Sequence, residues 1–151
     1  MTNRQKHSTI GAGAVIALAL LAASSAASSQ LYVRDEGRLH ETSYSGSEFH
    51  EEGQATGTLP GKLYASFNYT GASLTVTAQF TLMGNGWSLT GHGTGTLHNA
   101  NSASPSFSGP ATITGGTGRY AHAHAHGELY GVFYRRDHYA LTVQTLGELH
   151  Y

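Results

Sequence analysis

The sequence predicts an all-β fold, a single eight-stranded antiparallel β-barrel, on three observations. From Leu63 to the end of the chain, apolar and polar residues alternate with the period of two that is typical of a half-buried strand. Strong turn signals, such as Leu59-Pro60-Gly61 and Asn85-Gly86, separate these runs. No helical period occurs after the N-terminal apolar segment. A sheet with one apolar face must close to bury that face, and an up-and-down barrel does so without leaving edges.

Residues 1–29 are expected to be a secretory signal peptide. Arg4 and Lys6 precede an uncharged apolar run over 10–23, and the small residues of 24–29 give a signal peptidase a cleavage site near Ala27. The run is shorter than the roughly 20 residues of a membrane-spanning helix. We therefore expect a secreted or cell-surface protein with no stable membrane span in the mature chain. An uncleaved N-terminal anchor is the alternative.

The mature chain is expected to be one domain. Residues 30–56 contain most of the charge and are predicted to form irregular strands, and residues 57–151 are predicted to form the core of the barrel. Without Arg4 and Lys6 the net charge is 6 − 9 = −3, which argues against a nucleic-acid partner. The absence of cysteine means that the core and the hydrogen-bond ladder must hold the fold together, and it favours a bacterial source.

The strands are predicted in order from the alternation and the turns. A strand over 38–45, a turn at 45–47 and a poorly specified return come first. The regular strands that follow are predicted over 63–70, 74–82, 87–98, 107–114, 120–134 and 139–151. In the strand that begins at Tyr120, after the glycine-rich turn 115–118, the histidines are expected on one face and small or apolar residues on the other.

Two kinds of barrel fit this alternation. A water-soluble barrel turns its apolar stripe inward, whereas an outer-membrane barrel turns it toward lipid. The apolar stripe contains many glycines, namely Gly91, Gly93, Gly95, Gly109, Gly127 and Gly131. A lipid-facing belt built from glycine is thin, while the crowded interior of a small barrel needs small residues. The composition therefore favours the soluble barrel, with the histidines outside.

The motif Gly115-Gly116-Thr117-Gly118-Arg119-Tyr120-Ala121, preceded by an alternating strand that ends at Ile113-Thr114, resembles the corresponding segment of the allene oxide cyclase and dirigent barrel superfamily. The resemblance covers residues 57–151 and is strongest to small secreted bacterial members without an assigned activity. It implies an eight-stranded antiparallel barrel, which in plants is often oligomeric. The plant proteins hold a reactive intermediate in a hydrophobic cavity with a few acidic residues. None of those acidic positions aligns here, because Glu128 falls on the stripe assigned to the exterior.

The most concentrated chemistry lies in the histidine row. His122, His124 and His126 occupy alternate positions of one strand, about 6.5 to 7 Å apart, so neighbours can share a metal ion. With His92 or His98 from another strand they could bind Zn²⁺, Cu²⁺ or Ni²⁺. Two other interpretations stay open. The histidines can be polar residues of a solvated strand, or they can make the surface charge respond to mild acid.

The function predicted from these patterns is the binding of a small apolar or amphipathic molecule, without catalysis. The candidate cavity residues are the large apolar side chains on the inward stripes, Phe67, Phe80, Trp87, Phe107 and Phe133. No catalytic residue is assigned, because the chain has no cysteine and no G-x-S-x-G motif. The alternatives are a cyclase or isomerase with a buried carboxylate or tyrosine in its pocket, and a surface or metal-binding protein that uses the histidines. A homo-oligomer is left open.

Overall fold

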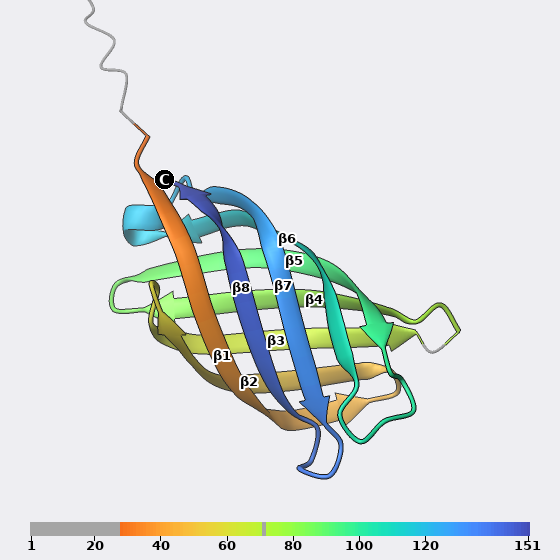
Figure 1. The fold of residues 1–151 in the computed structure, drawn as a ribbon. Helices are drawn as coiled ribbons and strands as arrows, with labels where there is room; N and C mark the ends of the chain where they lie inside the picture. The colour runs from red at the N-terminus through yellow and green to blue at the C-terminus, as the bar shows by residue number, and fades with distance from the viewer. Residues whose placement is uncertain (1–27, 71) are drawn as a thin grey trace, which may run out of the picture.

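Residues 28–70 and 72–151 are described by a computed structural model, in which they form one closed antiparallel barrel (Figure 1). Its strands are β1 (Gln30–Ser45), β2 (Glu48–Gly57), β3 (Gly61–Thr70), β4 (Thr75–Gly84), β5 (Trp87–His98), β6 (Ser106–Thr117), β7 (His124–Tyr134) and β8 (Ala140–His150). Each strand pairs with the next along the chain, and β1 pairs with β8. The prediction of an eight-stranded antiparallel barrel is confirmed. The predicted signal peptide falls on residues 1–29, of which 1–27 lie outside the described residues.

The N-terminal segment is more ordered than its composition suggests. Residues 30–56, expected to form irregular strands, form the strands β1 and β2; β1 is 16 residues long, and its register against β2 shifts between Glu41 and Ser43. Inward and outward positions alternate along β1, but the inward residues are not all apolar. The inward positions of β1 include Asp35, Gly37 and Glu41 beside Leu39, so the apolar stripe is interrupted. Closure of the barrel depends on this segment, since residues 30–39 of β1 pair with β8.

The glycine-rich stretch also differs. A turn was expected at 115–118, with a strand starting at Tyr120. Instead β6 continues to Thr117, a short 3₁₀ helix η1 spans Gly118–Tyr120, and β7 starts at His124. Tyr120 is therefore not on the histidine face. It points inward with 1% of its surface exposed. Its ring contacts those of Trp87 and Tyr151 edge-on, at centroid distances of 5.0 and 4.8 Å, and so it closes this end of the barrel.

The apolar stripe faces the interior, as predicted, and the interior packs as two clusters. One cluster contains Phe67, Phe107 and Leu129, with Leu39, Ala65, Val76, Ala78, Leu97 and Leu141. The other lies toward η1 and contains Ala55, Leu59, Leu82, Leu89, Tyr120, Ala123 and Leu149. Within the described residues, no helix is long and apolar enough to cross a membrane.

Candidate functional site

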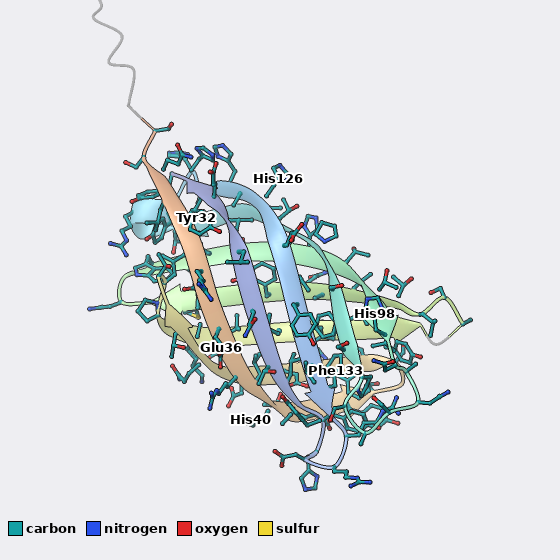
Figure 2. The ribbon with its side chains drawn as sticks, viewed as in Figure 1. Tyr32, Glu36, His40, His98, His126 and Phe133 are labelled. Carbon is teal, nitrogen blue, oxygen red and sulfur yellow. The ribbon has the colours of Figure 1, made fainter. Side chains whose placement is uncertain are left out.

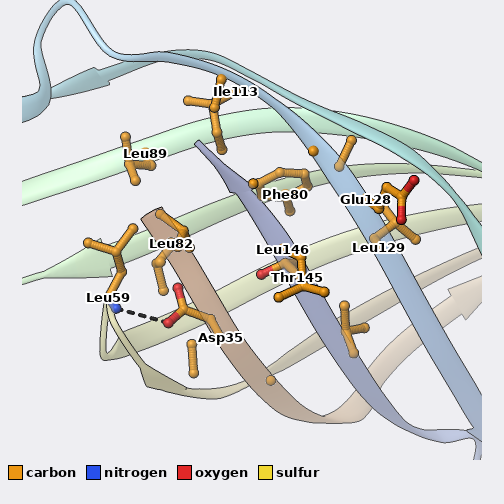
Figure 3. A pocket seen from close by; sticks show the side chains of 18 of the residues that line it. Asp35, Leu59, Phe80, Leu82, Leu89, Ile113, Glu128, Leu129, Thr145 and Leu146 are labelled. Atoms are coloured by element: carbon orange, nitrogen blue, oxygen red, sulfur yellow. Dashed lines mark hydrogen bonds between the residues drawn. The ribbon is translucent and has the colours of Figure 1, made fainter. Parts of the chain in front are cut away.

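The barrel interior contains a cavity of about 120 Å³ where the two core clusters meet (Figure 3). Its lining comes from both clusters and from most of the strands. Leu39, Phe67 and Leu129 belong to the first cluster, and Leu59 and Leu89 belong to the second. Nearly all of the lining is apolar, so the cavity suits a molecule with little need for hydrogen bonds.

The cavity exists because several of the inward residues around it are small. Gly37, Ala111, Gly127 and Gly147 all line the cavity, and Gly127 and Gly147 are register partners on β7 and β8. A Cβ atom at Gly127 would lie 2.3 Å from the carbonyl oxygen of Leu146, so this pair brings the two backbones close. The small-residue stripe that the sequence placed inside therefore creates the cavity wall.

Three carboxyl residues line the cavity, of which Asp35 on β1 is buried and Glu128 and Glu148 are exposed. Asp35 is 9% exposed, and its Oδ1 accepts a hydrogen bond of 2.9 Å from the backbone N–H of Leu59 (Figure 3). Burial raises the pKa of this carboxyl above its usual range, while the hydrogen bonds from the backbone of Leu59 and Thr58 act in the opposite direction. Asp35 thus anchors the β2–β3 turn and gives the apolar cavity one buried carboxyl group.

A second interior carboxyl, that of Glu51 on β2, has no partner. Glu51 is 2% exposed, and neither carboxyl oxygen has a hydrogen-bond partner among the described residues. It lies opposite Glu41 of β1 and opposite Ala65 of β3 in the register of the sheet. Burial, and then the charge of Glu41, raise the pKa of Glu51 to about 8. At neutral pH its carboxyl group is therefore mostly protonated inside the barrel.

The structure separates the five aromatic residues that the sequence proposed for the cavity. Phe67, Phe80 and Phe107 line it. Trp87 lies at the η1 end, packed against Tyr120. Phe133 packs against Phe67 and Phe107 (centroids 5.7 and 5.1 Å) and faces a smaller hollow of about 50 Å³ near the opposite rim, with Tyr139.

The acidic residues inside the barrel, Asp35 and Glu51, were not singled out by the sequence analysis. Both lie in the segment that it treated as irregular. The alternation of β1 could have identified Asp35 as an inward residue. Asp35 stands at every second position with Val33, Gly37 and Leu39, and all four residues point inward.

The histidines predicted to lie outside do so (Figure 2, where His126 and His98 are labelled). His124 and His126 are exposed on β7, and His122 is exposed in the turn before it. His92 lies on β5, and Thr112 of β6 stands between it and His126 in the sheet. Among the described residues, no three histidine, aspartate, glutamate or cysteine side chains are arranged to hold one metal ion.

A histidine that the sequence analysis left out, His150, stands directly opposite His124 on β8. Their rings stack with centroids 5.3 Å apart and planes at 17°. Only the register of β7 against β8 reveals this contact, because the two residues are far apart in the chain.

No family model matches this chain, and neither a curated protein nor a solved structure is found that is similar to it. The barrel alone does not distinguish one superfamily of small barrels from another. Membership of the allene oxide cyclase and dirigent superfamily therefore stays a prediction, based on the motif at residues 115–121.

Proposed function

We propose that this protein is a secreted β-barrel that binds a small, mainly apolar molecule in its interior cavity. The observation that supports this function is the cavity of about 120 Å³ between two otherwise well-packed core clusters. Protein interiors are normally close-packed. An apolar space that no side chain fills is therefore a candidate binding site. The resemblance of the 115–121 motif to the dirigent-type barrels supports the same kind of function.

The volume limits the size of the ligand. Pockets for drug-sized molecules have about 300 to 1,000 Å³, whereas an engineered apolar cavity of about 150 Å³ takes up benzene. A cavity of about 120 Å³ therefore suits a ligand of one small ring. Larger lipids and polyaromatic molecules would require the barrel to open or the core to repack.

Asp35 gives the ligand a preferred orientation. One of its oxygens accepts the N–H of Leu59, and a carboxyl group can accept further hydrogen bonds. A ligand with one N–H or O–H group at its edge can donate to it, while the rest of the ligand contacts Phe80, Leu82 and Leu89 (Figure 3). We therefore expect an amphipathic ligand to bind better than an apolar ligand of the same shape.

The test compares two ligands of one shape in the full chain. Phenol carries an O–H group where toluene carries a methyl group. Calorimetry, together with NMR shifts of the methyl groups that line the cavity, should show that both bind and that phenol binds more tightly, since a net hydrogen bond contributes about 1 kcal/mol. Ala111→Leu, which puts a larger side chain into the cavity wall, should weaken binding of both ligands by about tenfold or more.

Ala103→Leu is the matched control, because it makes the same change in an exposed loop position. It should leave both affinities unchanged. The proposal is overturned if neither ligand shifts the methyl groups of the wild-type cavity, or if Ala111→Leu folds cooperatively and binds as tightly as the wild type.

A cyclase or isomerase is the second candidate, and the carboxyl group of Asp35 on the cavity wall is the observation that favours it. A buried carboxyl with a raised pKa can transfer a proton to a bound intermediate. An enzyme of this class returns the ligand as an isomer of the same composition, and Asp35→Asn should abolish that conversion while it preserves binding. A binding protein returns the ligand unchanged with either residue at position 35.

A further inference from the structure

The outer face of β7 and β8, near the rim where the chain ends, brings together two imidazoles that are distant in sequence. His124 and His150 are register partners, and their rings lie 5.3 Å apart, centroid to centroid, with planes at 17°. His124 is exposed and His150 is half-buried. Two neutral rings so placed can turn their nitrogen atoms toward a common point by small side-chain rotations, because solvent borders them.

The next register pair on the same face adds two more metal-ligating groups. His126 of β7 stands opposite Glu148 of β8, one step along the outward stripe from His124 and His150. The carboxylate of Glu148 accepts a hydrogen bond of 3.0 Å from the side-chain amide of Gln30 on β1. This contact holds the negative charge of Glu148 beside the imidazoles, where it attracts a cation.

Two of these histidines have a hydrogen-bond partner at Nδ1, and in His124 that partner selects one tautomer. The Nδ1 atom of His124 lies 3.3 Å from the backbone carbonyl oxygen of His122, and that of His126 lies 3.4 Å from the hydroxyl oxygen of Thr112. A carbonyl oxygen can only accept, so the proton of His124 belongs on Nδ1 and the lone pair on Nε2. Metal-binding histidines show this arrangement, in which the second nitrogen donates to a carbonyl, carboxylate or similar group.

We propose that this face binds one divalent cation of the kind that imidazole prefers, with Cu²⁺ bound most tightly and Ni²⁺ and Zn²⁺ more weakly, through the Nε2 atoms of His124 and His150. The order follows the general affinity of nitrogen ligands for these ions. Because metal–nitrogen bonds are about 2.0 to 2.1 Å long, the stacked rings must tilt toward each other when the ion binds. Water completes the coordination, and Glu148 offsets part of the charge.

This site is separate from the interior cavity. His92, which the sequence analysis grouped with the histidine row, does not belong to it, since Thr112 lies between His92 and β7. The ring of His122 takes no part; only its backbone carbonyl oxygen does, as the hydrogen-bond acceptor of His124 Nδ1. The proposed metal site therefore uses one histidine from each of two strands, and not three histidines from one strand.

The test titrates the full chain with Cu²⁺ and follows the bound ion by calorimetry and electron paramagnetic resonance. The wild type should bind one ion at this site with two nitrogen ligands resolved in the spectrum. His124→Ala and His150→Ala should each weaken binding by about tenfold or more and leave one nitrogen. The double variant should bind more weakly than either single variant, but by less than the sum of the two single losses, because both residues hold the same ion.

His98→Ala is the control, since His98 is exposed on β5 with the hydroxyl group of Ser108 beside one ring nitrogen at 3.3 Å. It should change neither the affinity nor the spectrum. All variants should retain the wild-type melting temperature without metal. The proposal is overturned if His124→Ala and His150→Ala bind Cu²⁺ within about twofold of the wild type, or if their losses add in the double variant, as expected for histidines that bind ions independently.

Discussion

At the scale of single residues, the inward glycines decide where the large side chains of the interior can lie. A Cβ atom at Gly131 would lie 2.2 Å from the ring of Phe107, and one at Gly91 would lie 2.4 Å from the carbonyl oxygen of Thr112 and 2.6 Å from the ring of Phe80. An aromatic ring from another strand therefore covers each of these glycines, and at Gly91 the backbone of β6 also lies too close for a side chain. The same pairing of a ring with a glycine gives a narrow barrel room for phenylalanine.

Gly131→Ala should therefore destabilise the barrel by about 1 to 3 kcal/mol, the usual cost of forcing a side chain into a packed core. Chemical denaturation with a two-state fit measures this loss. Gly115→Ala is the matched control, since a Cβ atom there would meet only the hydroxyl oxygen of Thr90, at 3.8 Å. It should be neutral or slightly stabilising. Equal losses in the two variants would contradict the packing explanation.

Glu51 should make the stability of the barrel fall as the pH rises. Its pKa is raised from 4.5 to about 8 in the folded protein, so between these values the unfolded chain gives up a proton that the folded chain keeps. The free energy of unfolding should therefore decrease by a few kcal/mol across this range and level off above it. Burial of Asp35 raises its pKa too, and contributes in the same direction.

Glu51→Gln isolates the contribution of Glu51. The variant keeps the shape of the side chain but has no charge to bury, so it should be more stable than the wild type above pH 8 and differ little from it near pH 5. Urea unfolding of both proteins at a series of pH values measures the difference. A difference that does not change with pH would show that Glu51 is ionised, or exposed, in the folded protein.

At the scale of elements, the connection between β6 and β7 is a plug rather than a hairpin. Two glycines allow this path, Gly116 near the end of β6 and Gly118 at the start of η1. Gly118 has a φ of +61°, and a Cβ atom at Gly116 would lie 2.4 Å from the carbonyl oxygen of Ser88. The resulting η1 turns Tyr120 into the barrel end, between Trp87 and Tyr151. The glycine motif that suggested a turn thus places an aromatic side chain.

Tyr120→Ala should destabilise the protein by about 3 to 5 kcal/mol, as expected when a large buried aromatic side chain is removed. Tyr120→Phe keeps the ring and should lose no more than about 1 kcal/mol, the contribution of one hydroxyl group. Thermal melts and the near-ultraviolet circular dichroism of the aromatic cluster report both effects. A large loss in Tyr120→Phe would shift the explanation from the ring to its hydroxyl group.

At the scale of the whole molecule, the alternation of residues predicted the fold class and the direction of most side chains, but not their level along the barrel axis. Phe67 and Phe133 both belong to inward stripes, yet one lines the cavity and the other does not. The level depends on the register of eight strands, which period-two alternation leaves free. The stacking of His124 on His150 was out of reach for the same reason.

The parts of the molecule that could not be predicted are those where the alternation has no apolar signal. β1 places Asp35 and Gly37 on its inward face, so its stripe does not stand out by composition. A three-residue 3₁₀ helix such as η1 is too short to show a period at all. The candidate site lies across these regions, since Asp35 comes from β1 and η1 closes the end above the cavity.

The pairing of β1 with β8 brings the two ends of the described chain together. Ser29 and Tyr151 exchange both of their backbone hydrogen bonds, at 2.8 and 3.0 Å, so the two ends of the described chain are neighbours in the sheet. The order of strands around the barrel is thus a ring. A peptide link between these two residues would make the backbone a continuous loop of antiparallel strands, in which no strand is structurally first or last.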